Sequence, residues 1–405
     1  MPLPAGSRSG RSEASRVEGA GAIGGRGVRP GGSSPPALEL CSFVILREDL
    51  MSRLSRLVRS TVCLPIAALT LGACGTTTVS SPEDTAADAS SAISAQCAED
   101  STATSTGPVT ITDGVGRTVD LDHPAERIVV LEWQQIEDAL TLCVTPVGVS
   151  DVDGFSTWVS SEKLPEGVAD IGTREEPDLD ALYATDPDLI VVEAFTADDE
   201  IIAQLEDSGI PVLATLGARP EDPIGNMQDV FSMIGEATGR TKRATQVLDE
   251  FDEHLASAKK EVAGADLSTT DFLFFDGWVE SGTLTIRPYT DGALFTEIGK
   301  EMGLTPAWSA EVEESKGTGG VYPDYGLTTT DIEGLTAVGD ANLFYANDDG
   351  AGSYVEEMEK NDLWASLPAV QEGRVHKFPP RIWGAGGPRS CEQAIDAYVD
   401  ALTAA

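Results

Sequence analysis

The sequence predicts an α/β protein of two lobes joined by a single long helix, and three observations support this prediction. Short apolar runs alternate with helix-compatible segments in residues 108–222, and a second such set occupies residues 264–405. Between them, residues 223–263 carry apolar side chains at helical spacing. Strands that alternate with helices form parallel sheets with right-handed crossovers, so we expect each lobe to be a sheet wrapped by helices.

The first lobe is predicted to begin with a hairpin and to continue as a parallel sheet. The runs 109–112 and 119–121 flank an Asp113-Gly114 turn, which is typical of a hairpin. The strands predicted after it are the apolar runs 128–131, 146–149, 189–192 and 211–213. The helix-compatible segments between these runs include 136–140, 179–183 and 199–207.

Residues 223–263 form the predicted connecting helix. Apolar residues keep helical spacing from Ile224 to Ile234, and the stripe resumes after Gly239 and runs to Leu255. Such a helix bends little, so we expect small rocking movements of the lobes. The second lobe is predicted from strands at 272–275, 343–345 and 375–378, and from helices at 294–302, 355–358 and 391–402. Both lobes are then Rossmann-like.

The composition excludes several classes of protein. The 405 residues include 67 acidic and 27 basic ones, for a net charge of -40, and 41% are hydrophobic. This apolar fraction is ample for a packed core, whereas nucleic-acid binding needs dense Lys and Arg. The three His residues are far apart, and no nucleophile-elbow or phosphate-loop motif occurs. We therefore expect a monomer with no nucleic-acid partner, no catalytic residues and no metal ligands; a lipid-anchored extracellular hydrolase is the less favoured alternative.

The N-terminal region is typical of a bacterial lipoprotein signal. The run 62–73 is apolar but shorter than the roughly 20 residues that a spanning helix needs, and Arg53, Arg56 and Arg59 precede it. Leu71-Gly72-Ala73-Cys74 has the spacing of a lipobox, so we predict a signal peptide over 51–73 and lipidation of Cys74. Two acyl chains would hold the protein at the outer face of the cell membrane. A soluble secreted protein with an incidental Cys remains the alternative.

The segments on either side of this signal are not expected to fold. Residues 1–50 precede a complete signal and are interpreted as a non-native extension. Residues 74–107 are rich in Ala, Ser, Thr and acidic residues and lack apolar periodicity, so they are predicted to be a flexible tether.

The cysteines of the mature chain permit one internal disulfide. Besides Cys74 there are Cys97, Cys143 and Cys391. Cys143 ends an apolar helical stripe and is expected to stay a buried thiol. The predicted bridge is therefore Cys97–Cys391.

Aromatic and Arg residues occur where loops follow strands. In open α/β sheets ligands bind outside the carboxyl ends of the strands, and Glu132-Trp133 comes directly after the strand at 128–131, so Trp133 is expected to point to the cleft. Trp158 and Arg174 lie in polar connections of the first half. In the second half, Gly- and Pro-rich connections hold Tyr325, Arg381 and Trp383. Each aromatic could instead be core or lobe-interface packing.

Several ordered blocks resemble one protein family, from Val109 to the end of the chain. In the first half they are Arg127-Ile128-Val129-Val130-Leu131-Glu132-Trp133, Ile171-Gly172-Thr173-Arg174-Glu175-Glu176-Pro177 and Pro187-Asp188-Leu189-Ile190-Val191. In the second half they are Asp362-Leu363-Trp364, Gly373-Arg374-Val375 and Trp383-Gly384-Ala385-Gly386-Gly387-Pro388. Together they are similar to the ferric-siderophore substrate-binding proteins of bacterial ABC importers, and the ferric-hydroxamate branch fits best. The resemblance implies the fold of class III periplasmic binding proteins.

The resemblance also implies a ligand cleft between the lobes. The position of Arg174 is the one that hydrogen-bonds the iron-ligating oxygens in the family, and the positions of Trp133, Trp158 and Trp383 line the pocket. Tyr325 stands where the second lobe usually offers a Trp. A first-lobe Tyr is expected near Phe195 or Thr196, and neither supplies a phenol. Arg287 and Arg381 are weaker candidates.

The same resemblance suggests the ligand and the partners. A ferric hydroxamate arrives with six-coordinate iron, so the protein needs donors and aromatic walls but no metal ligand or cofactor of its own. Its acidic charge should disfavour tris-catecholates, although cobalamin, ferric citrate, haem or a catecholate remain alternative ligands. Asp180 and Asp331 match carboxylates that dock on the permease, which works with an ATPase. Either could instead be an ordinary helix N-terminal acid.

Overall fold

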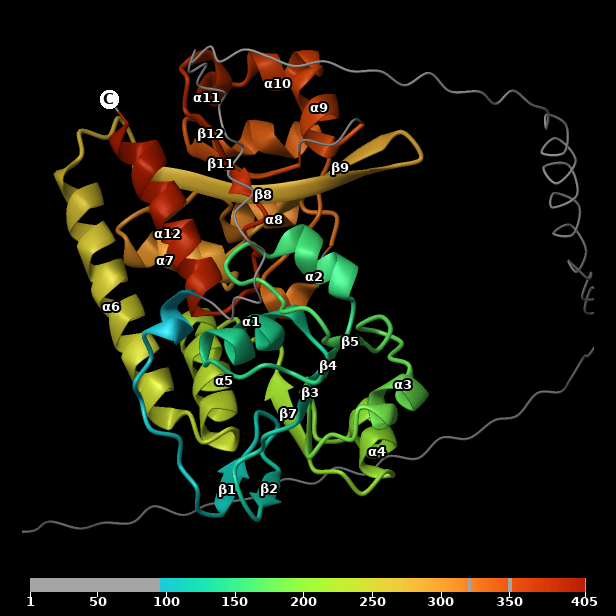
Figure 1. Ribbon diagram of the computed structural model, residues 1–405. Coiled ribbons are helices and arrows are strands. Elements are labelled where there is room, and N and C mark those ends of the chain that lie inside the picture. Colours follow the sequence, from blue (N-terminus) through green and yellow to red (C-terminus); the bar gives the residue numbers. More distant parts are fainter. Residues whose placement is uncertain (1–94, 320–321, 349–351, 405) are drawn as a thin grey trace, which may run out of the picture. The chain divides into compact units, whose positions relative to one another are not determined.

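A computed structural model describes residues 95–319, 322–348 and 352–404 of the chain (Figure 1). The predicted extension at 1–50, the predicted signal peptide at 51–73 and Cys74, the predicted lipidation site, lie outside the described residues. Within the described ranges, no helix is both long and apolar enough to cross a membrane. Two α/β lobes are present, as predicted, and α6 (Thr241–Gly264) runs beside α12 (Pro388–Thr403) along one side of them.

The first lobe contains a hairpin and a five-stranded parallel sheet. The hairpin of β1 (Val109–Thr112) and β2 (Thr118–Leu121) is confirmed. The sheet has the order β5-β4-β3-β6-β7, with strands Ala169–Asp170, Gly148–Val149, Ile128–Val130, Leu189–Ala194 and Val212–Leu216. Its helices are α1 (Trp133–Thr141), α2 (Val152–Trp158), α3 (Leu179–Ala184) and α4 (Glu200–Glu206). Sequence analysis missed β5, because two residues make no apolar run.

The second lobe contains a sheet of the order β10-β8-β11-β12, with β9 antiparallel on β8. These strands are Thr305–Pro306, Asp271–Glu280, Asn342–Asn347, Val375–Pro380 and, for β9, Thr283–Pro288. The helices besides α12 are α7 (Leu294–Glu301), α8 (Ala310–Lys316), α9 (Tyr354–Glu359), α10 (Asp362–Ser366) and α11 (Pro368–Gln371). Short 3-10 helices are η1 (Ala95–Ala98), η2 (Pro323–Tyr325) and η3 (Ile332–Val338). The β8–β9 hairpin was not predicted.

Both faces of the first-lobe sheet are buried. Ile128 and Val130 lie in one hydrophobic cluster, and Val129 and Leu131 lie in another on the opposite face. A strand covered on both sides reads as a continuous apolar run, which is why these residues could be recognised in the sequence.

The segment predicted as the connecting helix forms two helices, and the second of them, α6, joins the lobes. Helix α5 (Pro223–Ala237) ends before Gly239, which has φ +70°, and α6 starts at Thr241. A Cβ atom at position 239 would lie 2.9 Å from the Ser105 carbonyl oxygen, so the chain needs glycine at this turn. The prediction of one unbroken helix over 223–263 is therefore wrong. Helix α6 still joins the lobes, since Val247 packs in the first-lobe core and Phe251 and Val262 pack in the second.

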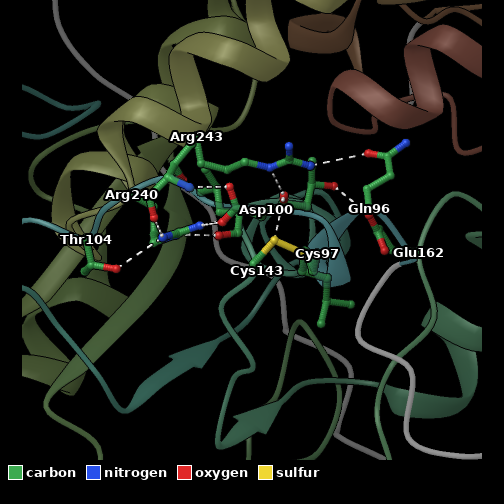
Figure 2. The surroundings of a disulfide bond; sticks show 12 residues. Gln96, Cys97, Asp100, Thr104, Cys143, Glu162, Arg240 and Arg243 are labelled. Carbon is green, nitrogen blue, oxygen red and sulfur yellow. Dashed lines mark hydrogen bonds and ion pairs between the residues drawn. A yellow bond between two sulfur atoms is a disulfide. The ribbon is translucent and has the colours of Figure 1, made fainter.

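Residues 95–107, called here the N-terminal strap, pack on the first lobe (Figure 2). Cys97 forms a disulfide with Cys143, and Arg240 forms an ion pair with Asp100. The Ser105 amide donates to the Gly239 carbonyl over 2.8 Å. The predicted tether over 74–107 is therefore wrong for residues 95–107.

The predicted Cys97–Cys391 bridge is also wrong. Cys391 is a free thiol, fully buried in the second-lobe core at the start of α12. Cys143 was expected to be that buried thiol, but it follows the end of α1 with φ 65° and is only half-buried, where the strap can reach it.

Candidate ligand-binding cleft

A cavity of about 600 Å³ lies between the lobes. On the first-lobe side its wall includes Glu132, which follows β3, and Glu193 and Phe195 at the end of β6. These two strands are neighbours at the point where the strand order reverses, which is where open α/β sheets bind ligands. The cavity volume falls in the range of small-molecule sites.

Arg174 is positioned by a carboxylate and an indole. Its Nη1 atom donates to both carboxylate oxygens of Glu132, at 2.9 Å each. Glu132 also caps α1, because it accepts from the Trp133 amide over 2.8 Å. The guanidinium carbon lies 3.9 Å from the centroid of the Trp133 ring. Glu175 is a more distant partner at 3.8 Å, so Arg174 is held toward the cavity and not at the surface.

Three buried N–H donors in and around Arg174 have no hydrogen-bond partner among the described residues. They are Arg174 Nε, Trp133 Nε1 and Trp383 Nε1. The two indole rings meet edge to face, with centroids 4.7 Å apart. Buried donors are nearly always paired in folded proteins, so Arg174 Nε and Trp383 Nε1, whose residues line the cavity, are suited to a ligand that brings oxygen acceptors.

Glu193 and Tyr325 meet across the cleft. The Tyr325 hydroxyl hydrogen-bonds the Glu193 carboxylate, and the Tyr325 ring packs against Phe195 with centroids 6.0 Å apart. Burial, with a smaller contribution from nearby Glu132, raises the pKa of Glu193 to about 7. Burial and the Glu193 charge raise the pKa of the Tyr325 phenol, so Tyr325 acts as a donor.

Arg287 lines the cavity but is already engaged. Its Nε and Nη2 atoms donate to Asp276 at 2.7 and 2.5 Å, and the Tyr289 hydroxyl donates to the same carboxylate at 3.2 Å. The pKa of Arg287 is raised because this carboxylate outweighs the effect of burial. Arg287 is thus a fixed part of the second-lobe wall.

Some predicted ligand-binding residues do not reach the cavity wall. Four of the predicted residues do line it: Arg174, Arg287, Tyr325 and Trp383. Trp133 does not, because it is only 4% exposed and packs its ring against the Arg174 guanidinium group.

Two predicted residues lie elsewhere. Trp158 is the last residue of α2, 43% exposed and outside the cavity lining, so the structure does not bring it to the site. Arg381 does not line the cavity either, since its Nη2 atom donates to the Val159 carbonyl at 2.8 Å and links the lobes.

Sequence analysis missed other parts of the wall. Glu132 and Glu193 were not proposed as site residues, although both are charged residues at the end of an apolar strand, which is a usable signal. Arg219 and Tyr322 also line the cavity, and no local pattern marks them.

The two predicted docking carboxylates are exposed, one on each lobe. Asp180 lies in the first turn of α3, whose N-cap is Asp178. Asp331 is the N-cap of η3 and accepts from the Glu333 and Gly334 amides. Both positions also suit an ordinary helix-terminal acid, so the structure leaves the docking role a prediction.

In the described ranges, no group of three or more His, Cys, Asp or Glu residues is arranged so that it could hold a metal ion. The cavity wall presents hydrogen-bond donors, aromatic rings and carboxylates.

Comparison with known proteins identifies relatives of the whole two-lobed body. The chain is 25% identical over 281 residues to the iron(3+)-hydroxamate-binding protein FhuD of Escherichia coli, covering 68% of this chain and 86% of that protein. It is 24% identical over 293 residues to the uncharacterized ABC transporter substrate-binding lipoprotein YvrC of Bacillus subtilis, covering 70% and 82%. These relatives are substrate-binding proteins and not enzymes.

The fold is shared with a solved structure, the Fe3+–Desferal-bound siderophore-binding protein FhuD from Vibrio cholerae. The TM-score is 0.57 at 23% identity, over 69% of this chain and 98% of that one. This likeness confirms the predicted class III architecture. A profile of the family described as periplasmic binding protein matches residues 128–382, and the chain therefore belongs to that family.

Proposed function

We propose that this protein captures an iron(III)–siderophore complex of the hydroxamate type outside the cytoplasm and delivers it to an ABC permease. It binds its ligand as a monomer and changes no covalent bond. The iron comes as cargo with its coordination complete, so the protein uses no metal ligand and no cofactor of its own.

The observation that carries the proposal is the donor cluster around Arg174. The Glu132 carboxylate and the Trp133 ring fix the guanidinium, and its Nε atom is left without a partner. A hydroxamate complex presents oxygens at its iron centre and an apolar framework around them, which suits charged donors and indole walls. The relative named for iron(3+)-hydroxamate binding supports this ligand class.

The charges of the cavity favour hydroxamates over catecholates. Its lining includes four carboxylates, Glu132, Glu175, Glu193 and Asp324, and three guanidinium groups, Arg174, Arg219 and Arg287. All three arginines already pair with carboxylates of the protein. A highly anionic tris-catecholate would therefore find little free positive charge, whereas a neutral or cationic hydroxamate complex would not need it.

The anchoring and the delivery step are parts of the same proposal. Lipidated Cys74 would hold the protein on the outer face of the cell membrane, and the likeness to a substrate-binding lipoprotein supports this location. Asp180 and Asp331, exposed on the two lobes, are the carboxylates that we propose to dock on the permease, which its ATPase powers.

Tryptophan fluorescence tests the ligand class directly, because Trp383 lines the cavity. The purified protein is titrated with ferric hydroxamates, a ferric tris-catecholate, ferric citrate, haem and cobalamin. We expect saturable quenching by a ferric hydroxamate. Arg174→Ala should weaken binding by about tenfold or more, since a hydrogen bond to a charged group contributes about 1.5–3 kcal/mol. Quenching by another chelate alone would contradict the hydroxamate assignment, and no response from a folded protein would remove the proposal.

A further inference from the structure

Glu193 differs in its partners from two nearby carboxylates, Glu132 of the cavity wall and Asp276 behind Arg287. Glu132 pairs with Arg174, and Asp276 pairs with Arg287. No salt bridge reaches Glu193 from any described residue, and its carboxylate accepts from the neutral Tyr325 hydroxyl. Glu193 is therefore a half-buried carboxylate whose charge no side chain directly offsets, whereas Asp324, which also lines the cavity without an ion pair to a described residue, is exposed.

The backbone holds this carboxylate at the cavity. Glu193 pairs with Thr215 of the neighbouring strand β7, so its Cα position is set by the sheet. Gly217, just beyond β7, leaves the room that the side chain fills: a Cβ atom there would lie 2.6 Å from Glu193 Cδ and 2.7 Å from Phe195 Cζ. The carboxylate is thus part of a shaped wall and not a flexible surface group.

The charged groups that face Glu193 come from three segments. Glu132, at the start of α1, repels a negative charge there, and Arg174, in the loop before α3, attracts it less strongly. Tyr325, on the second lobe, donates to it. Burial is the largest cause of the raised pKa of Glu193, because it removes water from the carboxylate. A cation placed beside Glu193 would offset this loss of hydration by pairing with the negative charge.

We propose that Glu193, with the Tyr325 hydroxyl, is a specificity-determining acceptor that makes this cleft prefer a ferric chelate bearing a protonated amine. The inference rests on the proposed function, since it names the class of chelate within it. The amine would lie between the lobes and neutralise Glu193, while Arg174 serves the oxygens at the iron centre.

A pH dependence follows from this arrangement. Glu193, with its pKa at about 7, must be ionised to bind the ammonium group, so binding releases a proton wherever the free carboxyl is protonated. Affinity for an ammonium-bearing chelate should then rise about tenfold from about pH 6 to about pH 8, as the ionised fraction rises from roughly one tenth to nine tenths. A chelate without the amine should show no such rise.

The experiment compares two ferric trihydroxamates: a linear ferrioxamine with a terminal ammonium group and its cyclic, uncharged counterpart. Dissociation constants are measured by tryptophan quenching at both pH values for the wild type, for Glu193→Gln and for Glu253→Gln. Glu253 is an exposed residue of α6, so its substitution removes the same charge away from the cleft. Thermal unfolding of each free variant checks its fold.

The expected result is a preference of the wild type and Glu253→Gln for the linear chelate, growing with pH. Glu193→Gln should lose both the preference and the pH dependence while still binding the cyclic chelate. Tyr325→Phe removes a hydrogen bond that lowers the pKa of Glu193, so it should move the pH dependence to higher pH. Equal, pH-independent affinities in the wild type, or a preference that survives in Glu193→Gln, would overturn the inference. If neither chelate binds, the proposed function itself fails.

Discussion

Carboxylates lie in two regions along helix α1, a half-buried one at its N-cap and two fully buried ones within it, and their surroundings differ. At its N-cap, Glu132 faces the cleft and pairs with a guanidinium group. One turn further, Glu137 faces the second lobe and accepts from the Ser390 amide at 2.7 Å and the Ser390 hydroxyl at 2.5 Å. Asp138 beside it is fully buried, and neither of its carboxylate oxygens has a partner among the described residues.

The difference follows from what each region must do. In the cleft, a charged pair keeps a guanidinium group pointed at the cavity, where the ligand can use its remaining donors. Between the lobes, Glu137 satisfies the N-terminus of α12, which has no cap of its own, and burial raises the pKa of Glu137 and raises that of Asp138 well above its usual range. The cleft thus presents the Arg174 guanidinium group to a ligand, whereas the surroundings of Glu137 and Asp138 favour neutral acids.

Removing the interlobe acceptor should have the largest effect on stability. Glu137→Ala leaves the buried Ser390 amide and hydroxyl without an acceptor, so we expect a loss of about 3 kcal/mol in the free energy of unfolding. Urea denaturation measures it. Glu137→Gln keeps an oxygen acceptor and should lose less of the free energy of unfolding. Equal losses in the two variants would show that the hydrogen bonds to Ser390 do not account for the loss of stability.

Stability should fall as the pH rises from about 5 to about 8. Burial raises the pKa of Glu162 to about 7 and raises those of Glu137 and Asp138, so the folded protein binds these protons more tightly than the unfolded chain. Their contribution is complete below the unfolded pKa values of about 4 to 4.5 and is lost as the pH passes the folded values. We expect a decrease of about 2 kcal/mol over this range in urea denaturation.

A matched variant isolates this contribution from the general repulsion among the acidic residues. Glu162→Gln keeps an acceptor for the Thr141 hydroxyl, which donates over 3.0 Å, but cannot titrate. Arg389 and Arg243 also face Glu162 and stay in place. The pH dependence should be shallower in this variant, and an unchanged slope would show that Glu162 does not contribute to it.

Breaking the ion pair between Glu132 and Arg174 in the cleft should affect ligand binding more than stability. Glu132→Ala removes the N-cap of α1 and releases Arg174, so we expect affinity for a ferric hydroxamate to fall about tenfold and stability to fall by about 1 kcal/mol. Quenching titrations and urea denaturation of the same preparation measure both. A large loss of stability with unchanged affinity would make this pair structural, like the interlobe contact.

The smallest effect is expected at Trp158. It is exposed and does not line the cavity, so Trp158→Ala should change affinity by less than about twofold. A strong loss of affinity would mean that α2 moves onto the ligand when it binds.

Sequence patterns predicted most of the fold but only part of the site. The strands at 128–131 and 189–192 were recognisable because both faces of the sheet bury them, whereas β5 is too short to leave a pattern. Arg174 and Trp383 were found through their motif blocks. Glu193 was missed, because its importance depends on the strand beside it and on Tyr325 from the other lobe.

The sequence by itself determined the alternation of strands and helices, the acidic charge and the family resemblance, because these are local or additive properties. Only the tertiary structure decided that Cys97 pairs with Cys143, that Gly239 interrupts the connecting helix and that Glu132 and Glu193 share one cavity wall with Arg174. Such outcomes depend on which segments, distant in the chain, come within bonding distance. No local pattern in the chain records those distances.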